Sequence, residues 1–208
     1  MFTYNYMQPK EYHFSLDSIQ LAKLVANELR GAKNLKNIRV LDLCAGCGVV
    51  GFELAWHLPL LQQLDFMEVQ AVYTPYFEQN VMIVNRPELQ LHWHLLNYDV
   101  LLKKEWKNKF DLIISNPPYF HPEDGMLSPS IFKNRCRFFL DSSFENFIHA
   151  LANSLAPAGK SYFLMRSLKQ HGYDLLANIQ ALLKETNVSV KKVMPIRGTE
   201  VIFLEKDI

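Results

Sequence analysis

Hydrophobic and polar residues alternate along the chain with two periods, one typical of β-strands and one typical of α-helices. Short, mainly apolar runs, of which 38–43 is also β-branched, predict strands at 38–43, 64–68, 91–95, 110–115, 161–165, 188–193 and 201–204. Apolar residues at helical spacing predict helices at 15–30, 49–58, 74–84, 142–156 and 173–184. Strands that alternate with helices indicate right-handed crossovers, and hence a parallel sheet with helices on both faces.

Several residues mark where the predicted helices begin and end. Gly31 follows the first helix as a stop signal, and Thr74-Pro75 indicates an N-cap with proline at the first helical position. Ser142 and Glu145 have the spacing of a capping box, and we expect the helix that they begin to end near 156–159.

The last two predicted strands have no helix between them, so we expect them to pair antiparallel at an edge of the sheet. The predicted fold is α/β, a doubly wound Rossmann-like sheet that is mostly parallel with an antiparallel C-terminal edge pair. The 208 residues suit one domain, 1–208, in which a helical segment at 1–35 precedes a core at 36–208.

The composition is that of an ordinary globular protein, with 49% hydrophobic and 21% charged residues. A net charge of +1 argues against strong attraction of the whole molecule to a polyanion. Basic residues do cluster locally, so a nucleic-acid patch and a solvated surface both stay open: Lys103, Lys104, Lys107 and Lys109, then Lys133, Arg135 and Arg137. Without an export signal or an apolar stretch of about 18 residues, we expect a cytoplasmic protein with no membrane partner.

The chain has three cysteines, an odd count that argues against a disulfide framework. Cys44 and Cys47 have the spacing of redox motifs and of half a zinc site. Because no second pair completes such a site, we expect neither metal nor redox chemistry.

A glycine loop follows the first predicted strand. Gly46, Gly48 and Gly51 match G-x-G-x-x-G, and Glu68 lies 20 residues after Gly48, at the end of the next strand. This pattern is also the fingerprint of dinucleotide-binding proteins, in which the loop holds a pyrophosphate.

Asp42, at the end of the strand before this loop, argues against a dinucleotide because a carboxylate there repels a pyrophosphate. S-adenosylmethionine fits better, since it presents an ammonium group to Asp42, a carboxylate to the loop amides and a ribose diol to Glu68. Asp99, at the end of the third strand, is expected to accept a hydrogen bond from the adenine amine. The alternatives are that Asp42 caps the next helix or loop and that Asp99 is a surface turn residue.

The fourth strand ends in Asn116-Pro117-Pro118-Tyr119, which would lie at the same edge of the sheet. A planar amine is a poor nucleophile until two acceptors bind its two N–H groups. The Asn116 side-chain oxygen and the Pro117 carbonyl are candidates for those acceptors. The prolines restrict the backbone and supply no competing N–H, and Tyr119 can stack on the flat group. The alternative is an ordinary turn, because Asn-Pro often ends a strand.

Together these motifs resemble the class I S-adenosylmethionine-dependent methyltransferases that modify amino groups, over residues 8–201. The resemblance implies a seven-stranded sheet with an antiparallel last pair. It also implies one set of residues that bind the cofactor: Asp42, Cys44, Ala45, Gly46, Gly48, Glu68, Asp99 and Asn116. The implied catalytic signature is Asn116, Pro117, Pro118 and Tyr119.

Within that family, the order of motifs is most similar to bacterial tRNA(Val) adenine N6-methyltransferases. The resemblance therefore implies methylation of a planar exocyclic amine, and adenine in tRNA is the favoured substrate. The implied partner is tRNA or another RNA. Three alternatives remain: a protein glutamine methyltransferase of the type that modifies release factors, a methyltransferase of small amines, and a nicotinamide-dependent oxidoreductase that uses the glycine loop. The motifs do not predict an oligomeric state.

Overall fold

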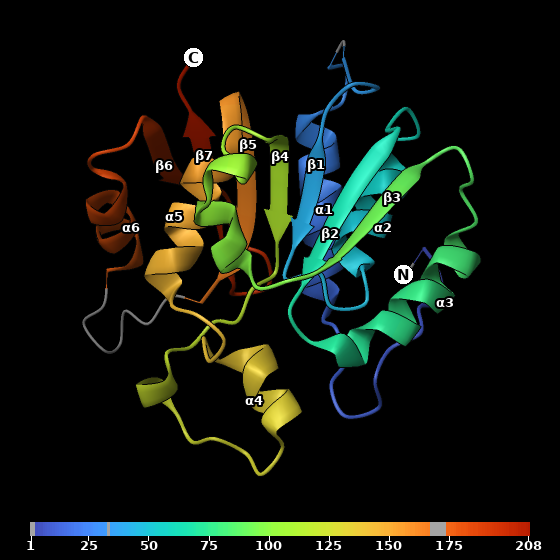
Figure 1. The fold of residues 1–208 in the computed structure, drawn as a ribbon, viewed down its shortest axis with the longest axis horizontal. Helices are drawn as coiled ribbons and strands as arrows, with labels where there is room; N and C mark the ends of the chain where they lie inside the picture. Colours follow the sequence, from blue (N-terminus) through green and yellow to red (C-terminus); the bar gives the residue numbers. More distant parts are fainter. Residues whose placement is uncertain (1–2, 33, 167–173) are drawn as a thin grey trace.

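A mixed sheet of seven strands runs through the computed structural model, which describes residues 3–32, 34–166 and 174–208 (Figure 1). The strand order is β3-β2-β1-β4-β5-β7-β6. The strands are β1 (Val40–Leu43), β2 (Gln63–Glu68), β3 (Gln90–Leu95), β4 (Phe110–Ser115), β5 (Leu155–Met165), β6 (Val188–Lys192) and β7 (Glu200–Lys206). The α-helices are α1 (Leu16–Glu28), α2 (Val49–His57), α3 (Thr74–Val84), α4 (Ile131–Arg137), α5 (Phe144–Ser154) and α6 (Leu175–Leu183).

The predicted sheet topology is confirmed. Strands β1 to β5 pair in parallel, and β7 pairs antiparallel with both β5 and β6. Only β6 of the last pair lies at the edge, because β7 is inserted between β5 and β6. The order reverses at β1 and β4, and ligands of open α/β sheets bind at such a switch point, outside the carboxyl ends of the strands.

Two apolar layers cover the faces of the sheet (Figure 1). One packs α1, α2 and α3 against one face, and the other packs α5 and α6 against the opposite face. Neighbouring residues of β1 illustrate the alternation, since Val40 belongs to the first layer and Leu41 to the second. Among the described residues, no helix has the length and apolar character needed to cross a membrane.

Two predicted helix starts are wrong, and a third is not tested. The N-cap of α5 is Ser143, whose hydroxyl accepts from Asn146 N, and Ser142 hydrogen bonds elsewhere. Thr74 is the first residue of α3 rather than its cap, because a 3-10 turn at Ala71–Tyr73 leads directly into the helix. The last helix was predicted from Tyr173, which lies outside the described residues; its described part begins at Leu175.

Strand β5 begins at Leu155, where the helix before it was predicted to continue. The strand passes through Pro157 and Ala158, which has a left-handed φ of 59°, and the register with β4 shifts in this region. A Cβ at Gly159 would lie 2.6 Å from the Ala156 carbonyl oxygen, so this bulge requires glycine there. Helix α4 was not predicted, because its seven residues are too few to show a helical period.

Candidate active site

A cavity of about 320 Å³ opens at the carboxyl ends of β1, β2 and β4. Its walls are the start of α1 with the segment before it, the glycine loop, the ends of β2 and β3, the 116–120 segment and residues 135–142. In Figure 1, α4 lies beyond the arrowheads of β2 and β4, so it covers this end of the sheet. The cavity therefore gathers segments that are far apart in the chain, from Gln8 to Arg166.

The glycine loop uses its three glycines for different reasons. Gly48 is the N-cap of α2 with a left-handed φ of 85°, and Gly46 has a φ of 54°. A Cβ at Gly51 would lie 2.5 Å from the Phe66 ring, so glycine lets α2 approach β2 closely. Cys44 and Ala45 also line the cavity. The spacing read from the sequence thus marks a bend over the cavity and a helix–strand contact behind it.

Asp42 lies behind the loop rather than on the cavity wall. Its side chain is fully buried, and Oδ2 accepts a hydrogen bond of 2.7 Å from Gly51 N in the first turn of α2. Oδ1 is buried without a hydrogen-bond partner among the described residues. Burial raises the pKa of Asp42 well above its usual range, and the Gly51 bond only partly opposes that shift. This geometry matches the alternative interpretation of Asp42 as a cap; the direct ammonium contact stays a prediction.

Glu68 lies on the cavity wall, and its predicted contact with the cofactor ribose stays a prediction. Its Oε2 accepts from Gly46 N at 2.8 Å, and its Oε1 accepts from Val69 N and Gln70 N. Burial raises the pKa of Glu68, and these three N–H donors oppose that shift. A carboxylate offers about four acceptor positions, so one position, on Oε2, stays open for a further donor.

Asp99 is turned away from the cavity. Its Oδ1 accepts from Ser142 Oγ at 2.5 Å and from Asn146 Nδ2 at 3.3 Å, which ties it to the start of α5. Asn97 and Tyr98 line the cavity at this strand end instead, and Asp99 is absent from the described lining residues. The adenine contact predicted for Asp99 is therefore still untested, and the neighbouring side chains are nearer to the cavity.

Asn116, Pro117, Pro118 and Tyr119 all line the cavity, together with the glycine loop. Asn116 Oδ1 accepts a hydrogen bond of 2.5 Å from the Tyr119 hydroxyl, and Asn116 Nδ2 donates to Ser18 Oγ at 2.9 Å. Burial raises the pKa of Tyr119, so its hydroxyl stays protonated and able to donate. The predicted signature thus forms one connected group whose carboxamide is held at both ends.

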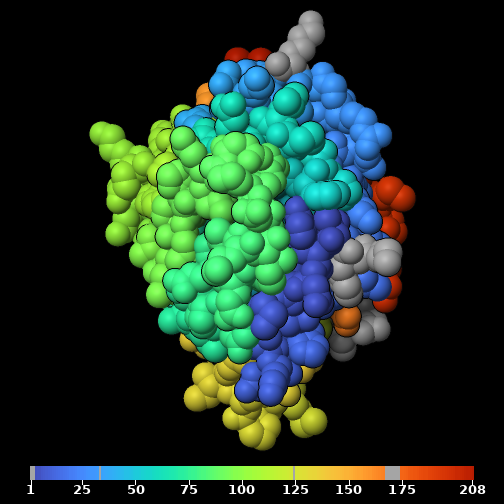
Figure 2. Space-filling view, turned by 90° about the vertical axis from the view of Figure 1, so that its right-hand side faces the viewer, coloured from blue at the N-terminus to red at the C-terminus, as the bar shows by residue number. Residues whose placement is uncertain are grey.

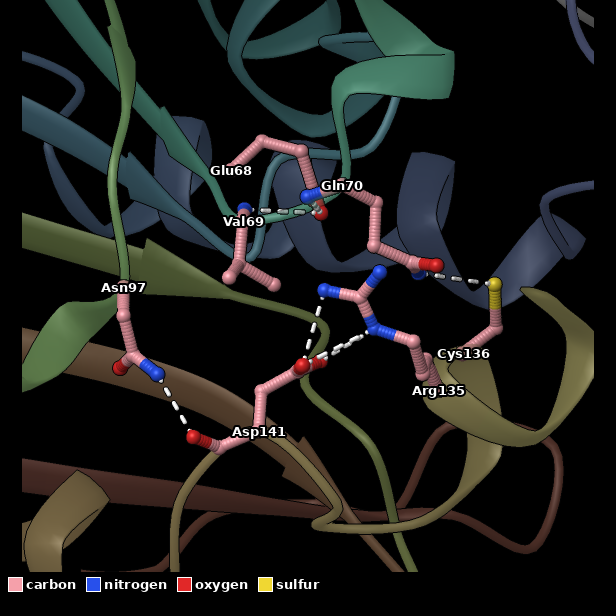
Figure 3. Close-up of polar contacts among 7 residues, drawn as sticks. All are labelled: Glu68, Val69, Gln70, Asn97, Arg135, Cys136 and Asp141. Carbon is pink, nitrogen blue, oxygen red and sulfur yellow. Dashed lines mark hydrogen bonds and ion pairs between the residues drawn. The ribbon is translucent and has the colours of Figure 1, made fainter. Parts of the chain in front are cut away.

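Arg135 is a cavity residue whose role the sequence did not predict (Figure 3). Its Nη2 lies 2.8 Å from Asp141 Oδ1, and its Nε contacts both Asp141 oxygens at 2.9 Å. Figure 3 shows the guanidinium between Asp141 and the strand end that carries Glu68 and Gln70. In the sequence, the only signal for Arg135 is its place in the basic cluster with Lys133 and Arg137. The ion pair with Asp141 gives no signal, because the two residues are too near in sequence for the pair to indicate a separate site.

The segment before α1 closes another side of the cavity. Buried Glu53 accepts from the Thr3 and Tyr6 hydroxyls, and Asn80 bonds to both backbone groups of Met7. Asn80 also donates to the Cys47 carbonyl at 2.9 Å, so it joins this segment to the glycine loop. Figure 2 shows the segment in dark blue on the surface, beside the green of α3 and reaching the yellow of α4.

The two basic clusters lie at different ends of the sheet. Arg135 and Arg137 line the cavity, whereas Lys109 directly precedes β4 and lies at the amino ends of the parallel strands. Lys109 Nζ packs 3.9 Å from the centroid of the Trp106 ring. The cluster at 103–109 therefore does not border the candidate site.

The thiols of Cys44, Cys47 and Cys136 are free. Cys136 contacts the Tyr73 hydroxyl at 3.2 Å and Gln70 Nε2 at 3.4 Å on the cavity wall. No cluster of three or more His, Cys, Asp or Glu side chains suited to a metal ion occurs in the part of the chain that the structure describes.

Residues 14–190 match the model of a protein family described as the methyltransferase small domain. The chain belongs to this family. As a member of it, with the fold described above, the protein is an S-adenosylmethionine-dependent methyltransferase.

Curated relatives of this methyltransferase carry a more specific name. It is 26% identical over 188 residues to the tRNA1(Val) (adenine(37)-N6)-methyltransferase of Haemophilus influenzae (strain PittGG), covering 88% of this chain and 77% of that protein. It is 28% identical over 88 residues to the enzyme of the same name from Proteus mirabilis (strain HI4320), covering 40% of this chain and 32% of that one.

Solved structures show that this fold serves other methyltransferases as well. The ribosomal protein L11 methylase of Lactobacillus delbrueckii subsp. bulgaricus has a TM-score of 0.62 and 16% identity, over 94% of this chain and 81% of its own. The precorrin-6y C5,15-methyltransferase of Geobacter metallireducens GS-15 has a TM-score of 0.58 and 12% identity, over 98% and 95%. At these identities the likeness shows the fold alone, and a substrate has to be argued from the site.

Proposed function

We propose that this methyltransferase transfers the methyl group of S-adenosylmethionine to a planar exocyclic amine, and that its substrate is adenine in tRNA. The observation that carries the proposal is that the Asn116 carboxamide lines the same cavity as Pro117, Tyr119 and the Glu68 carboxylate. The names of the Haemophilus influenzae and Proteus mirabilis relatives support the nitrogen of adenine as the acceptor and tRNA as the partner.

The residues of the cavity fit the cofactor. The open acceptor position of Glu68 suits a ribose hydroxyl, and Gly46 brings the backbone to the cavity wall without a Cβ. We propose that Cys44, Ala45, Gly46 and Gly48 form the backbone cradle for its amino-acid end. We propose that Asn97 and Tyr98, with Val69, border the adenine, because these residues line the cavity and Asp99 does not. Asp42 would act on the cofactor by holding the first turn of α2, or through its unpaired Oδ1.

Asn116 Oδ1 would accept one N–H of the incoming amine, and the Pro117 carbonyl would accept the other. No described residue donates a hydrogen bond to the Pro117 carbonyl, so it is available. Two such acceptors favour a pyramidal nitrogen whose lone pair is localised and nucleophilic. When bound, the cofactor supplies a methyl group on a positively charged sulfur, so that no general base has to act before transfer.

Tyr119 completes the acceptor site. Its hydroxyl holds Asn116 Oδ1, and its ring offers a flat surface on the cavity wall. A purine can stack on such a ring, which would place the exocyclic nitrogen beside the carboxamide. Arg166 lies with its guanidinium carbon 5.9 Å from the centre of this ring and lines the cavity too, so a positive charge lies beside the proposed substrate site.

The test is incubation with methyl-labelled S-adenosylmethionine and separate pools of unmodified tRNA, ribosomal RNA, DNA and protein extract. We expect label in the tRNA pool, and N6-methyladenosine after nuclease digestion. Label in a glutamine side chain of the protein pool would replace this substrate by the glutamine alternative. Label in no macromolecular pool would contradict the proposal.

A further inference from the structure

A serine in the first turn of α1 is the only described residue that holds the amide nitrogen of Asn116. Ser18 is 2% exposed, and its Oγ accepts from Asn116 Nδ2 at 2.9 Å although 98 positions separate the two residues. The carboxamide is thereby held with Nδ2 toward α1 and Oδ1 toward Tyr119. Because a carboxamide has a donor at one end and an acceptor at the other, its orientation decides what it offers the substrate.

The turn that carries Ser18 is itself fixed at several points. Asp17 Oδ2 accepts from Thr199 Oγ1 at 3.3 Å, and Asp17 Oδ1 lies 3.2 Å from Arg197 Nε. Ser18 N also donates to Ser15 O at 3.2 Å. The connection between β6 and β7 therefore holds the start of α1, and the start of α1 holds Asn116.

We infer that Ser18 is a positioning residue for the methyl-transfer step, which orients Asn116 so that Oδ1 and not Nδ2 is presented to the substrate amine. The inference rests on the function proposed above. An inverted carboxamide would present an N–H donor to the N–H groups of the amine, which would repel the substrate group and remove one of its two acceptors. Ser18 borders the cavity, and its side-chain hydrogen bond goes to Asn116, through which it acts on the reaction.

Steady-state and single-turnover methylation of tRNA by Ser18→Ala test this inference. We expect kcat to fall about 10-fold, since small errors in the position of a catalytic group lower rates strongly. The dissociation constant for S-adenosylhomocysteine should stay within about twofold, because Asn116 acts mainly on the transition state. Ser18→Thr keeps the hydroxyl and should recover most of the rate. Ser154→Ala removes another buried helical hydroxyl, bonded to Ala150 O, and should leave the rate unchanged.

The orientation can be followed apart from activity, by NMR of protein labelled with ¹⁵N-asparagine. In the wild type, the Asn116 side-chain N–H₂ signals should show one hydrogen-bonded proton protected from exchange. Ser18→Ala should shift these signals and remove the protection, whereas Ser154→Ala should do neither.

The possible outcomes separate the two proposals. A wild type that methylates tRNA together with an equally fast Ser18→Ala would overturn the positioning role alone, and so would unchanged Asn116 signals in Ser18→Ala. A wild type that methylates no pool would overturn the proposed function, while the NMR comparison would still decide whether Ser18 orients Asn116. Loss of cofactor affinity in Ser18→Ala at unchanged kcat would also overturn the role.

Discussion

Two aspartates, one near each end of the parallel strands, have opposite electrostatic environments. Asp111, near the amino end of β4, pairs with Arg39 through its two carboxylate oxygens at 2.8 to 3.1 Å. Burial raises its pKa, but the Arg39 bonds outweigh burial and the pKa of Asp111 is lowered. Asp42, near the carboxyl end of the adjacent β1, is fully buried with one unpaired oxygen, and its pKa is raised well above the usual range.

Other polar groups also differ between the amino ends and the carboxyl ends of the parallel strands. At the amino ends, Lys206 Nζ donates to Asn108 Oδ1 at 2.9 Å and to the Ala152 carbonyl at 2.8 Å, so this nearly buried ammonium is well satisfied within the protein. At the carboxyl ends, the glycine loop contains the left-handed residues Cys44, Gly46 and Gly48, and Glu68 keeps an open acceptor position. Left-handed residues occur at both ends, since Asn108 and Ala158 lie at the amino ends, so the difference lies in the polar groups. The end with satisfied groups contributes to stability, and the other end keeps unsatisfied groups for ligands.

The largest effect should come from Asn116→Ala. We predict that kcat falls by about 100- to 1000-fold, as when one preorganised polar group of a reaction centre is removed. The dissociation constant for S-adenosylhomocysteine, measured by calorimetry, should change by no more than a few-fold. Asn108→Ala is the matched change at the amino end and should lower the melting temperature without changing kcat. Weakened cofactor binding as the main effect of Asn116→Ala would contradict the assigned role.

A smaller loss is expected for Glu68→Gln, in which one carboxylate oxygen becomes an N–H₂ donor that faces backbone donors. We predict that S-adenosylhomocysteine binds about 10- to 100-fold more weakly, the range for a hydrogen bond to a charged group. Calorimetry measures this affinity, with Glu205→Gln in β7 as the control, since the Glu205 carboxylate forms an exposed ion pair with Lys160 away from the cavity. Unchanged affinity would exclude Glu68 from the cofactor site.

The two aspartates should respond to pH in opposite directions. The folded-state pKa of Asp42 is raised, so its contribution to stability is fully present below the unfolded pKa of about 3.9 and is lost as pH rises through the folded pKa. Asp42→Asn carries no such charge, and we predict a melting temperature roughly 2–4 °C above that of the wild type at pH 8, with the difference shrinking toward pH 4.

Asp111→Asn should change the stability with the opposite pH dependence. The folded-state pKa of Asp111 is lowered, so its contribution is present above the unfolded pKa and is lost as pH falls through the folded one. The variant should melt below the wild type at pH 8 and converge with it at low pH. Parallel pH profiles for Asp42→Asn and Asp111→Asn, followed by circular dichroism, would refute the contrast between the two ends.

The smallest effect concerns the two basic clusters. Arg137→Ala, at the cavity, should weaken tRNA binding about threefold and reduce the salt dependence by about one released counterion. Lys107→Ala, in the cluster at 103–109, should change neither. Filter binding across a range of salt concentrations measures both, and equal effects of the two changes would show that the substrate also contacts the other end of the sheet.

Much of the architecture was readable from local patterns. The alternation of strands and helices predicted the sheet, because each period reflects a face that must be buried. The positions of Gly46, Gly48 and Asn116 were predictable from the ends of two strands. The two glycines come shortly after the end of β1, and Asn116 comes directly after the end of β4. Helix ends were less accurate: Ser142 and Ser143 are equally good caps by type, and only the contact of Ser142 with Asp99 separates them.

The sequence by itself determined which strands would be present and that a glycine bend would follow β1. It also determined that an asparagine and a tyrosine would come directly after β4. Only the tertiary structure decided that Asp42 packs under α2, that Asp99 turns toward α5, and that distant residues complete the site. The pairing of Ser18 with Asn116 belongs to this second group. The physical reason is that side-chain direction and partner choice depend on how elements far apart in the chain pack together, and residue type and spacing carry no record of that packing.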